Sequence, residues 1–383
     1  MAASADPELA FVLACVRRDA GATAARALAA EAVGDWRRVA DLARQHDVPW
    51  WVVRELPRES VPSEVRDALV DETRDLARRA MAGTRELLAV LQALSHGGVR
   101  ALAYKGPALA ADVHGDLAAR RFTDLDILIA KRDRAAARRA LAAAGYRAPA
   151  GFTEREARFY HAWEGVDLLE HDASVWPVEL HWRCHARRYG APQDPAPLFA
   201  TARTMALGGA EVLVPGSEEL AALLALHGVK HAWRSLLWVA DFGHAVQRDG
   251  FDWMRLAAIA SEWSQACALH TALLVAHDVL EVPVPVAMRD RARSDHRAAR
   301  LAGAAVSALR GEVTTEDVGR ESTARYDLQW LAGAWPQVRY VMYAASLPTT
   351  RERQALRLPD ALLPLAFPVR ALRLLRRALG GGE

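Results

Sequence analysis

Two aspartates separated by one apolar residue, Asp124-Leu125-Asp126, are the residues of this sequence best suited to chemistry. They run into the apolar stretch 127–129, which is typical of a buried β-strand. Residues two apart on a strand face the same way, so both carboxylates are expected on one face while Leu125 packs inward. Like charges that close repel unless a cation lies between them. Oxygen ligands suit Mg²⁺, so the pair predicts a divalent metal site that also takes substrate phosphates.

A glycine turn that could hold phosphate precedes the pair. Residues 100–104 read as a short buried strand, Gly106 permits a close backbone approach, and Pro107 suits the first position of a helix. The free N–H groups at the start of that helix would face an anion, with Lys105 beside them. Arg121 is a second cation, and a guanidinium binds phosphate through two parallel hydrogen bonds. Together these pieces predict a place for a metal–triphosphate.

A third carboxylate is needed, because a lone acidic pair of this spacing is common by chance. The run 178–182 reads as a strand in which apolar neighbours bracket Glu179. His181 lies two residues further on and shares that face. It could hydrogen-bond to the metal ligands, or its role could be purely structural, and the sequence leaves both open. Asp167 and Glu170 are rival third carboxylates, although their flanking residues match the pattern less well.

At these motifs the chain resembles the polymerase-β-type nucleotidyltransferase superfamily, whose pattern is a glycine turn opening a helix, an acidic pair and a third acidic residue on a later strand. More narrowly, it is similar to bacterial nucleotidyltransferase family proteins through three pieces: Lys105-Gly106, Arg121-Phe122-Thr123-Asp124-Leu125-Asp126 and Glu179-Leu180-His181-Trp182. The stretches 35–43 and 227–241 also fit, so the likeness covers roughly residues 30–290. One departure is that the usual Gly-Ser turn is Gly106-Pro107, which removes a serine hydroxyl from the phosphates.

The resemblance implies a fold, an activity and residue roles. The expected class is α/β (α+β), a small mixed-sheet nucleotidyltransferase core flanked by N-terminal and C-terminal helical segments. The expected enzyme transfers a nucleoside monophosphate from an NTP to an acceptor, with Mg²⁺ or Mn²⁺ held by Asp124, Asp126 and Glu179. The residues expected to bind the nucleotide are Lys105, Gly106, Arg121, Lys230 and His231. A satisfied polar patch beside Trp233 and Trp238 is the alternative for Lys230 and His231.

Two other functions stay open. The chain could keep this fold as a nucleotide-sensing or partner-binding module without turnover, although an idle site has no need of three carboxylates that repel one another. It could also be a tRNA-modifying, toxin-like nucleotidyltransferase, against which the formal net charge of +2 speaks weakly. The acceptor, whether a small molecule, a peptide or RNA, is not readable from the sequence.

Composition and cysteine usage describe an ordinary soluble protein. Of the 383 residues, 52% are hydrophobic and 25% are charged. The three cysteines are widely spaced and form no C-x-x-C pair, which predicts neither disulfides nor a zinc site and suits a reducing cytosol. The N-terminus lacks a basic region followed by an apolar run, and no apolar stretch approaches about eighteen residues. We therefore expect a cytoplasmic protein without a signal peptide or a transmembrane helix.

Three regions are expected along the chain: helical residues 1–97, the α/β core 98–212, and helical residues 213–383. The charged stretch 289–325 contains the best candidate for a mobile linker or loop. The segment 362–379 predicts an Arg-rich helix that could contact an anionic membrane, although docking onto the protein's own core is the commoner outcome for such helices.

Overall fold

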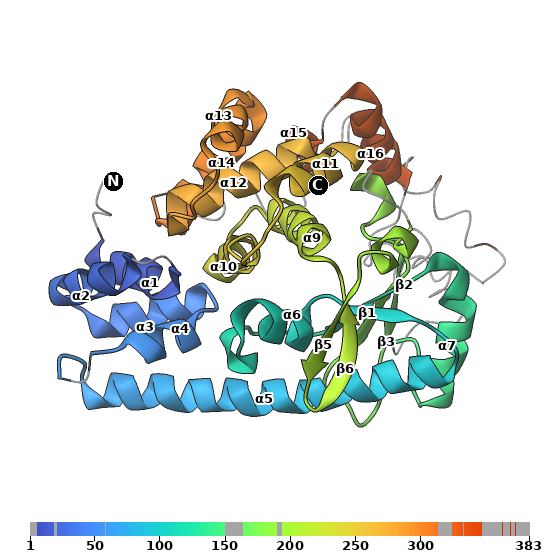
Figure 1. Cartoon of the computed structure of the whole chain (residues 1–383), viewed down its shortest axis with the longest axis horizontal. Coiled ribbons are helices and arrows are strands. Elements are labelled where there is room, and N and C mark those ends of the chain that lie inside the picture. Colours follow the sequence, from blue (N-terminus) through green and yellow to red (C-terminus); the bar gives the residue numbers. More distant parts are fainter. Residues whose placement is uncertain are drawn as a thin grey trace.

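The computed structural model describes residues 6–18, 21–57, 59–149, 164–189, 194–312, 324–331 and 333–346, and the single positions 362, 368 and 372. Within these described residues, no helix is both long and apolar enough to cross a membrane. The chain forms a small sheet with helices before and after it (Figure 1). This confirms the predicted α+β class. The region borders at residues 97 and 212 stay a prediction.

Four short helices open the chain: α1 (Pro7–Val16), α2 (Ala22–Ala32), α3 (Trp36–Gln45) and α4 (Pro49–Glu55). Asp6 and Asp35 are the N-cap residues of α1 and α3, because their carboxylates accept hydrogen bonds from backbone N–H groups of the first turn. Trp50 and Trp51 are buried, as expected for core aromatics. The Trp51 indole donates a hydrogen bond to the carbonyl of Ala119 at 3.1 Å, which ties this helical region to the chain just before the acidic pair.

The long helix α5 (Ser63–His96) runs along one side of the molecule (Figure 1). It lies in the region 1–97 that was expected to be helical. It is one continuous helix because apolar residues such as Val65 and Leu69 keep the helical spacing, and no proline interrupts residues 63–96. Gly97 caps its C-terminal end.

The sheet has four strands: β1 (Ala101–Ala103), β2 (Leu125–Ile129), β3 (Val166–Leu169) and β4 (Val178–His181). Their spatial order is β1-β2-β4-β3, with β2 and β4 parallel and the two outer pairs antiparallel. The predicted small mixed sheet is therefore confirmed. The helix after the glycine turn is α6 (Gly106–Leu109), which continues through a π-helical turn, η1 (Ala110–His114), and is followed by the 3₁₀ turn η2 (Leu117–Ala119).

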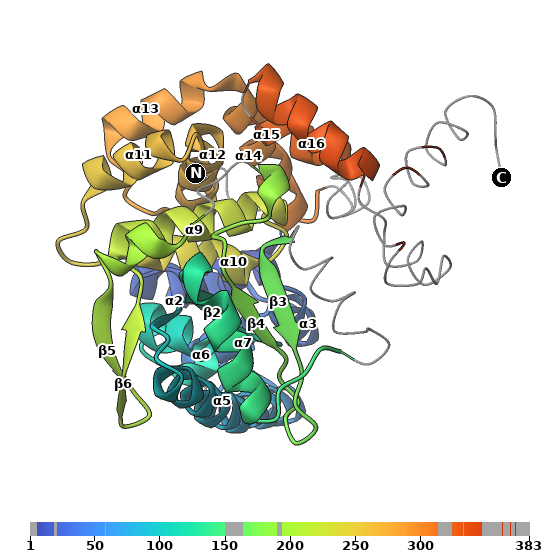
Figure 2. The same cartoon turned by 90° about the vertical axis from the view of Figure 1, so that its right-hand side faces the viewer.

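The two faces of the sheet have different partners. Leu125, Ile127 and Leu180 lie on one face and belong to a buried cluster with residues of α5 and of α7 (Arg134–Ala143). The other face bears Asp126 and Glu179, and is covered by α9 (Ser217–Lys230), whose Leu223 packs in one apolar cluster with Leu102 and Leu128. In Figure 2, α9 lies above the strands of the sheet, and α5 and α7 lie below them.

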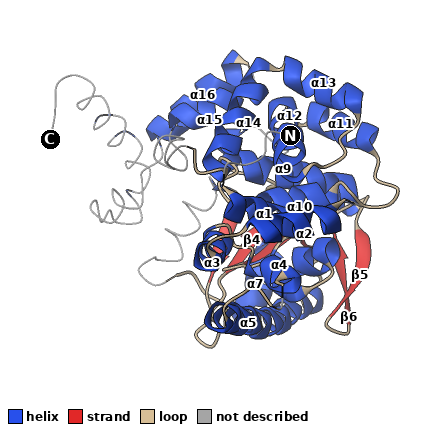
Figure 3. Cartoon of the chain, turned by 90° about the vertical axis from the view of Figure 1, so that its left-hand side faces the viewer, coloured by secondary structure: helices blue, strands red, loops and turns tan. Residues whose placement is uncertain are grey.

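The hairpin β5 (Arg203–Leu207) and β6 (Ala210–Val214) leads into the C-terminal helices. These are α9, α10 (Leu236–Ala245), α11 (Trp253–Glu262), α12 (Ala266–Leu280), α13 (Val286–Ser294), α14 (His296–Leu309), α15 (Ala324–Trp330) and α16 (Ala334–Ser346). In Figure 3 helices lie around β4, whereas β5 and β6 lie at the edge of the molecule.

The charged stretch 289–325 was expected to contain a linker or loop, and its first part is helical. Residues up to Leu309 form α13 and α14, because Ala292, Ala298 and Leu301 are buried while the intervening charged residues project outward. A charged stretch with a buried small-residue stripe is an amphipathic helix, not a loop. Residues 313–323 lie outside the described part of the chain. The predicted helix 362–379, with its proposed membrane contact, also lies outside it apart from single positions.

Candidate active site

Two carboxylates from neighbouring parallel strands form the centre of the site. The β2–β4 register places Asp126 directly beside Glu179 on the same face of the sheet. His181, two residues further along β4, lies between them, with its Nε2 3.1 Å from Asp126 Oδ1 and 3.2 Å from Glu179 Oε2. The hydrogen bonds to both carboxylates outweigh the burial of His181 and raise its pKa. His181 therefore contacts both acids and is not a remote structural residue.

Asp124 lies immediately before β2 and is partly exposed. Burial, followed by repulsion from Asp126 and Glu179, raises its pKa to about 6. By contrast, the pKa of Asp126 is lowered: burial alone would raise it, but Lys105 and His181 outweigh that effect. The pKa of Glu179 is also lowered, because His181 offsets the cost of burial. Asp124 is thus the acid of the three whose charge the protein compensates least.

Lys105 contacts the acidic pair directly. Its Nζ lies 3.0 Å from Asp126 Oδ1, and only 15% of its side chain is exposed. Burial would lower the pKa of Lys105, but Asp126 and then Glu179 raise it overall. The sequence predicted Lys105 as a phosphate ligand. In this structure it neutralises the buried aspartate.

Gly106 makes the sharp turn between β1 and α6. Its φ of +57° is a conformation that a side chain disfavours, and a Cβ there would lie 3.4 Å from the carbonyl oxygen of Asp124. The turn therefore brings the start of α6 against the backbone at the acidic pair. The sequence analysis expected Gly106 to permit a close backbone approach to a phosphate. In this structure the group that the Gly106 backbone approaches is the carbonyl oxygen of Asp124.

The rival third carboxylates lie elsewhere. Asp167 is fully buried on the other face of the sheet, where Arg134 Nη2 lies 2.7 Å and Arg138 Nη1 3.2 Å from its Oδ1. Glu170 forms an isolated backbone bridge with Arg147, at the rim of a different pocket. Neither residue lines the cavity that contains Glu179.

A cavity of about 700 Å³ opens above the acids. We call Asp124, Asp126 and Glu179, with Lys105 and His181, the carboxylate wall. A second part of the lining, the imidazole wall, consists of His185, His227, Lys230, His231 and Trp238. His227 and His231 share a face of α9, with ring centroids 4.6 Å apart, and the His231 ring lies 5.0 Å from that of Trp238. Lys230 and His231, which the sequence predicted for nucleotide binding, therefore share one cavity with the acidic residues.

The charged forms of the lysine and the imidazoles in the imidazole wall are disfavoured, so their pKa values are lowered. Burial and then the charge of Lys105 lower the pKa of Lys230. Burial, with Lys230 and Lys105 next, lowers the pKa of His231 to about 3. The pKa values of His185 and His227 are lowered well below the usual value by burial first and nearby lysines second. An anion in the cavity would reverse these effects.

Arg121 and its neighbour Arg120 both line the cavity, but they differ in burial. Arg121, the predicted phosphate ligand, lines the cavity, but 58% of its side chain is exposed and its closest acid is Asp47 at 3.7 Å. Arg120 is buried in the same lining, with Nε 3.0 Å from Asp241 Oδ2. The sequence reasoning missed Arg120, since two adjacent arginines give no signal as to which is buried. Asp241, in the stretch 227–241 that fits the resemblance, was a signal that could have pointed to a buried cationic partner.

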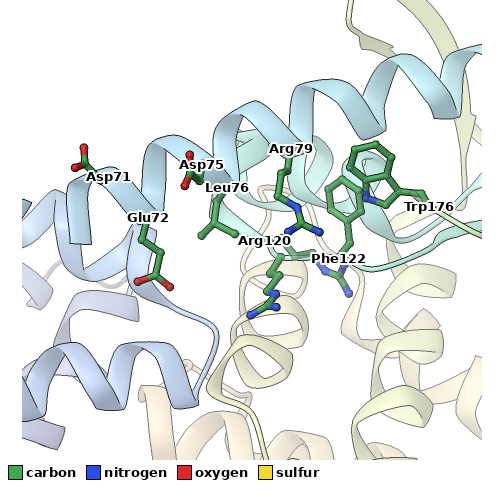
Figure 4. A pocket seen from close by; sticks show the side chains of 10 residues that line it. Asp71, Glu72, Asp75, Leu76, Arg79, Arg120, Phe122 and Trp176 are labelled. Carbon is green, nitrogen blue, oxygen red and sulfur yellow. The ribbon is translucent and has the colours of Figure 1, made fainter. Parts of the chain in front are cut away.

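A second cavity of about 400 Å³ adjoins the first (Figure 4). It shares Arg120, Arg121 and Phe122 with the larger one. Its other lining residues are Asp71, Glu72, Asp75, Leu76, Arg79, Ala80 and Trp176. Phe122 packs against α5 at Gly83, where an added Cβ would lie 2.6 Å from the phenyl ring. A small residue at position 83 therefore lets the aromatic floor of this cavity approach the helix.

The residues present fit a divalent cation. One donor atom from each of Asp126, Glu179 and His181 lies within 4.8 Å of the others, in the part of the chain that the structure describes. Two carboxylates, with the under-compensated Asp124 next to them, form an oxygen-rich set that suits Mg²⁺ or Mn²⁺. A cation there would also neutralise the charge of Asp126, which Lys105 now compensates.

A family model described as uncharacterised nucleotidyltransferase matches residues 33–281, which is well over half of the chain. The match includes the glycine turn, all four strands, α9 and α10. No curated protein and no solved structure matches the chain.

Proposed function

The chain belongs to the uncharacterised nucleotidyltransferase family, and from this premise we propose that it transfers a nucleoside monophosphate from an NTP to an acceptor at the cavity described above. We assign the cavity to the polymerase-β-type of site, with Asp124, Asp126 and Glu179 as ligands of Mg²⁺ or Mn²⁺. The nucleotide phosphates contact Lys105, the Gly106 turn, Arg121, Lys230 and His231.

One observation supports this proposal above the others. Asp126 and Glu179 come from strands that are far apart in sequence, yet the parallel register puts them side by side on the one face that opens to a cavity. The same cavity contains a lysine and three imidazoles whose charged forms are disfavoured. A ligand that satisfies both parts of the lining carries a cation and several anionic oxygens, as a metal–triphosphate does.

In the proposed reaction, an acceptor oxygen or nitrogen attacks the α-phosphorus of the NTP. The bond from that phosphorus to the bridging oxygen breaks, and pyrophosphate leaves with the bonding electrons. Glu179 takes the proton from the acceptor. Lys230 and His231 bind the leaving phosphates, and Lys105 neutralises charge near the α-phosphate. Bound divalent ions supply Lewis-acid stabilisation of the attacking and leaving oxygens.

The test is incubation of the protein with each α-labelled NTP, Mg²⁺ and fractions of a cell lysate. We expect one fraction to become labelled and pyrophosphate to be released in equal amount. Thermal unfolding gives a second readout: an NTP should raise the melting temperature with Mg²⁺ but not in EDTA, since a triphosphate binds bare carboxylates poorly. An equal shift in EDTA would contradict the assignment of the carboxylates as metal ligands.

The same experiment separates the other functions. A nucleotide-sensing module would show the metal-dependent thermal shift without release of pyrophosphate. A tRNA-modifying enzyme would label the RNA fraction alone. The cytoplasmic location and the nature of the acceptor stay predictions to be tested.

A further inference from the structure

Arg120 lies where the two cavities meet. It lines both of them, and only 7% of its side chain is exposed. A buried guanidinium is costly unless it is compensated, and it keeps its charge at every ordinary pH. Burial would lower the pKa of Arg120, but Asp241, and then the site acids Asp126 and Asp124, outweigh this and raise it. Arg120 is therefore a permanent positive charge within the field of the carboxylate wall.

The contacts of Arg120 leave one side of its guanidinium available. Among the described residues it donates only through Nε, to Asp241 Oδ2 at 3.0 Å. The two Nη groups make no hydrogen bond to a described residue. In Figure 4 the Arg120 side chain lies below α5 and points away from that helix. A guanidinium held by Nε alone can still offer both Nη groups to phosphate oxygens.

A buried chain of contacts fixes this orientation. Asp241 is 1% exposed, and its second oxygen accepts from Nε2 of His114 at 2.8 Å. His114 Nδ1 lies 3.1 Å from Nδ1 of His244, whose Nε2 lies 2.9 Å from the carbonyl of Val16. Both oxygens of Asp241 are thus occupied, so its carboxylate cannot rotate away from Arg120. The chain links α10, η1 and α1 behind the site.

We propose that Arg120 is a catalytic residue that binds the transferred phosphoryl group and the pyrophosphate leaving from it, with Asp241 and His114 as its positioning residues. This inference rests on the proposed function and adds a residue that it does not include. Negative charge grows on the phosphoryl and leaving oxygens during the reaction, and a cation that is already oriented stabilises it without reorganisation.

The test compares Arg120→Gln, Arg120→Ala and Arg120→Lys with Arg248→Gln as a matched control. Arg248 also makes a half-buried ion pair, 2.9 Å from Asp112 Oδ1, but it lines neither cavity. We expect Arg120→Gln to lower kcat about 100-fold or more, with KM for the NTP changed less than about 10-fold, and to weaken binding of inorganic pyrophosphate about 10-fold. Arg248→Gln should lower the melting temperature without changing kcat.

Two further results separate a catalytic from a structural role. Added guanidinium ion should restore part of the activity of Arg120→Ala, which a folding defect would not allow. Asp241→Asn should lower kcat about 10-fold at nearly unchanged KM, since the guanidinium stays but is less well oriented. If Arg120→Gln fails to fold, Arg120→Lys keeps the ion pair with Asp241, and it should fold while losing activity because an ammonium lacks the planar fork.

Full activity in Arg120→Gln or in Arg120→Lys would overturn the inference, as would an equal loss of kcat in Arg248→Gln. An absence of turnover in the wild type contradicts the proposed function instead. In that case pyrophosphate binding decides: an unchanged affinity in Arg120→Gln overturns the inference, and a weakened one supports it.

Discussion

The two walls of the main cavity handle their charges in opposite ways. On the carboxylate wall, Lys105 and His181 lie within hydrogen-bond distance of Asp126, and the pKa of that acid falls. On the imidazole wall, no acidic side chain of the described residues is within hydrogen-bond distance of Lys230 or His227, and the pKa values of both fall because burial disfavours their charged forms and Lys105 repels them. Among the described residues, Asp126 thus has cationic partners at hydrogen-bond distance, and Lys230 and His227 have no acidic ones.

The difference indicates which kind of ligand would stabilise each wall. On the carboxylate wall, Lys105 and His181 compensate Asp126, whereas the pKa of Asp124 stays raised, so a divalent metal ion would supply the compensation that Asp124 lacks. The imidazole wall becomes favourable only when an anion enters, so its energy is released on binding of a phosphate group. Each of the following predictions removes one side of this contrast, from the largest expected effect to the smallest.

The largest effect is expected for the acidic pair. Asp126→Asn and Asp124→Asn should each lower transfer by about 1,000-fold or more, because the amide keeps the shape but loses the negative charge that binds the metal. The measurement is release of pyrophosphate at saturating NTP and Mg²⁺. The two variants should differ in stability, since Asp126→Asn leaves Lys105 buried without its partner. Parental activity in either variant would remove the metal site from the carboxylate wall.

Glu179→Gln is expected to lower turnover about 100-fold while NTP affinity changes only a few-fold, since basicity and charge matter most in the transition state. Asp167→Asn is the control on the other face of the sheet. It should reduce stability, because Arg134 and Arg138 lose a charged partner, and leave turnover unchanged. The reverse pattern would place the third carboxylate on β3.

Asp124 should make the metal-free protein sensitive to pH. Its pKa is raised to about 6 from the ordinary value of 3.8. The folded state therefore binds this proton more tightly than the unfolded chain does. Stability is fully present below about pH 3.8 and is lost as the pH rises through about 6. In EDTA at pH 7.5, Asp124→Asn should be more stable than the wild type by about 1–3 kcal/mol.

Denaturant titrations at pH 7.5 and pH 4 measure this difference, which should vanish at the lower pH. Added Mg²⁺ should remove the advantage of the variant at pH 7.5, because the cation compensates Asp124 in the wild type. A variant less stable than the wild type in EDTA at pH 7.5 would show that the repulsion among the three acids is already relieved.

The smallest effect is expected on the imidazole wall. Lys230→Gln should weaken NTP binding about 10-fold, as one charge-assisted hydrogen bond to a phosphate is lost. Calorimetric titration with the NTP and Mg²⁺ measures it. Lys131→Gln is the matched control, since Lys131 is an exposed lysine outside both cavities. Equal affinities of the two variants would make Lys230 part of a structural patch.

Local features of the site follow from the sequence, because they depend on neighbours along the chain. The period of two in a strand puts Asp126 and Leu125 on opposite faces, and Glu179 and His181 on the same one. A positive φ favours glycine, which marks Gly106 as a candidate turn. The same local reasoning did not predict the helices within 289–309, since charge density alone does not reveal that small residues such as Ala292 and Ala298 form a buried stripe.

The pairing partners were decided by the tertiary structure alone. Nothing local distinguishes Arg120 from Arg121. Arg120 is fixed because the chain brings Asp241, 121 residues away, against it. Lys105 likewise pairs with Asp126 only once β1 and β2 align, and α9 brings Lys230 into the cavity by packing Leu223 on the sheet. Burial removes water from charges, so each buried charge needs a specific partner, and that partner is set by packing between distant segments.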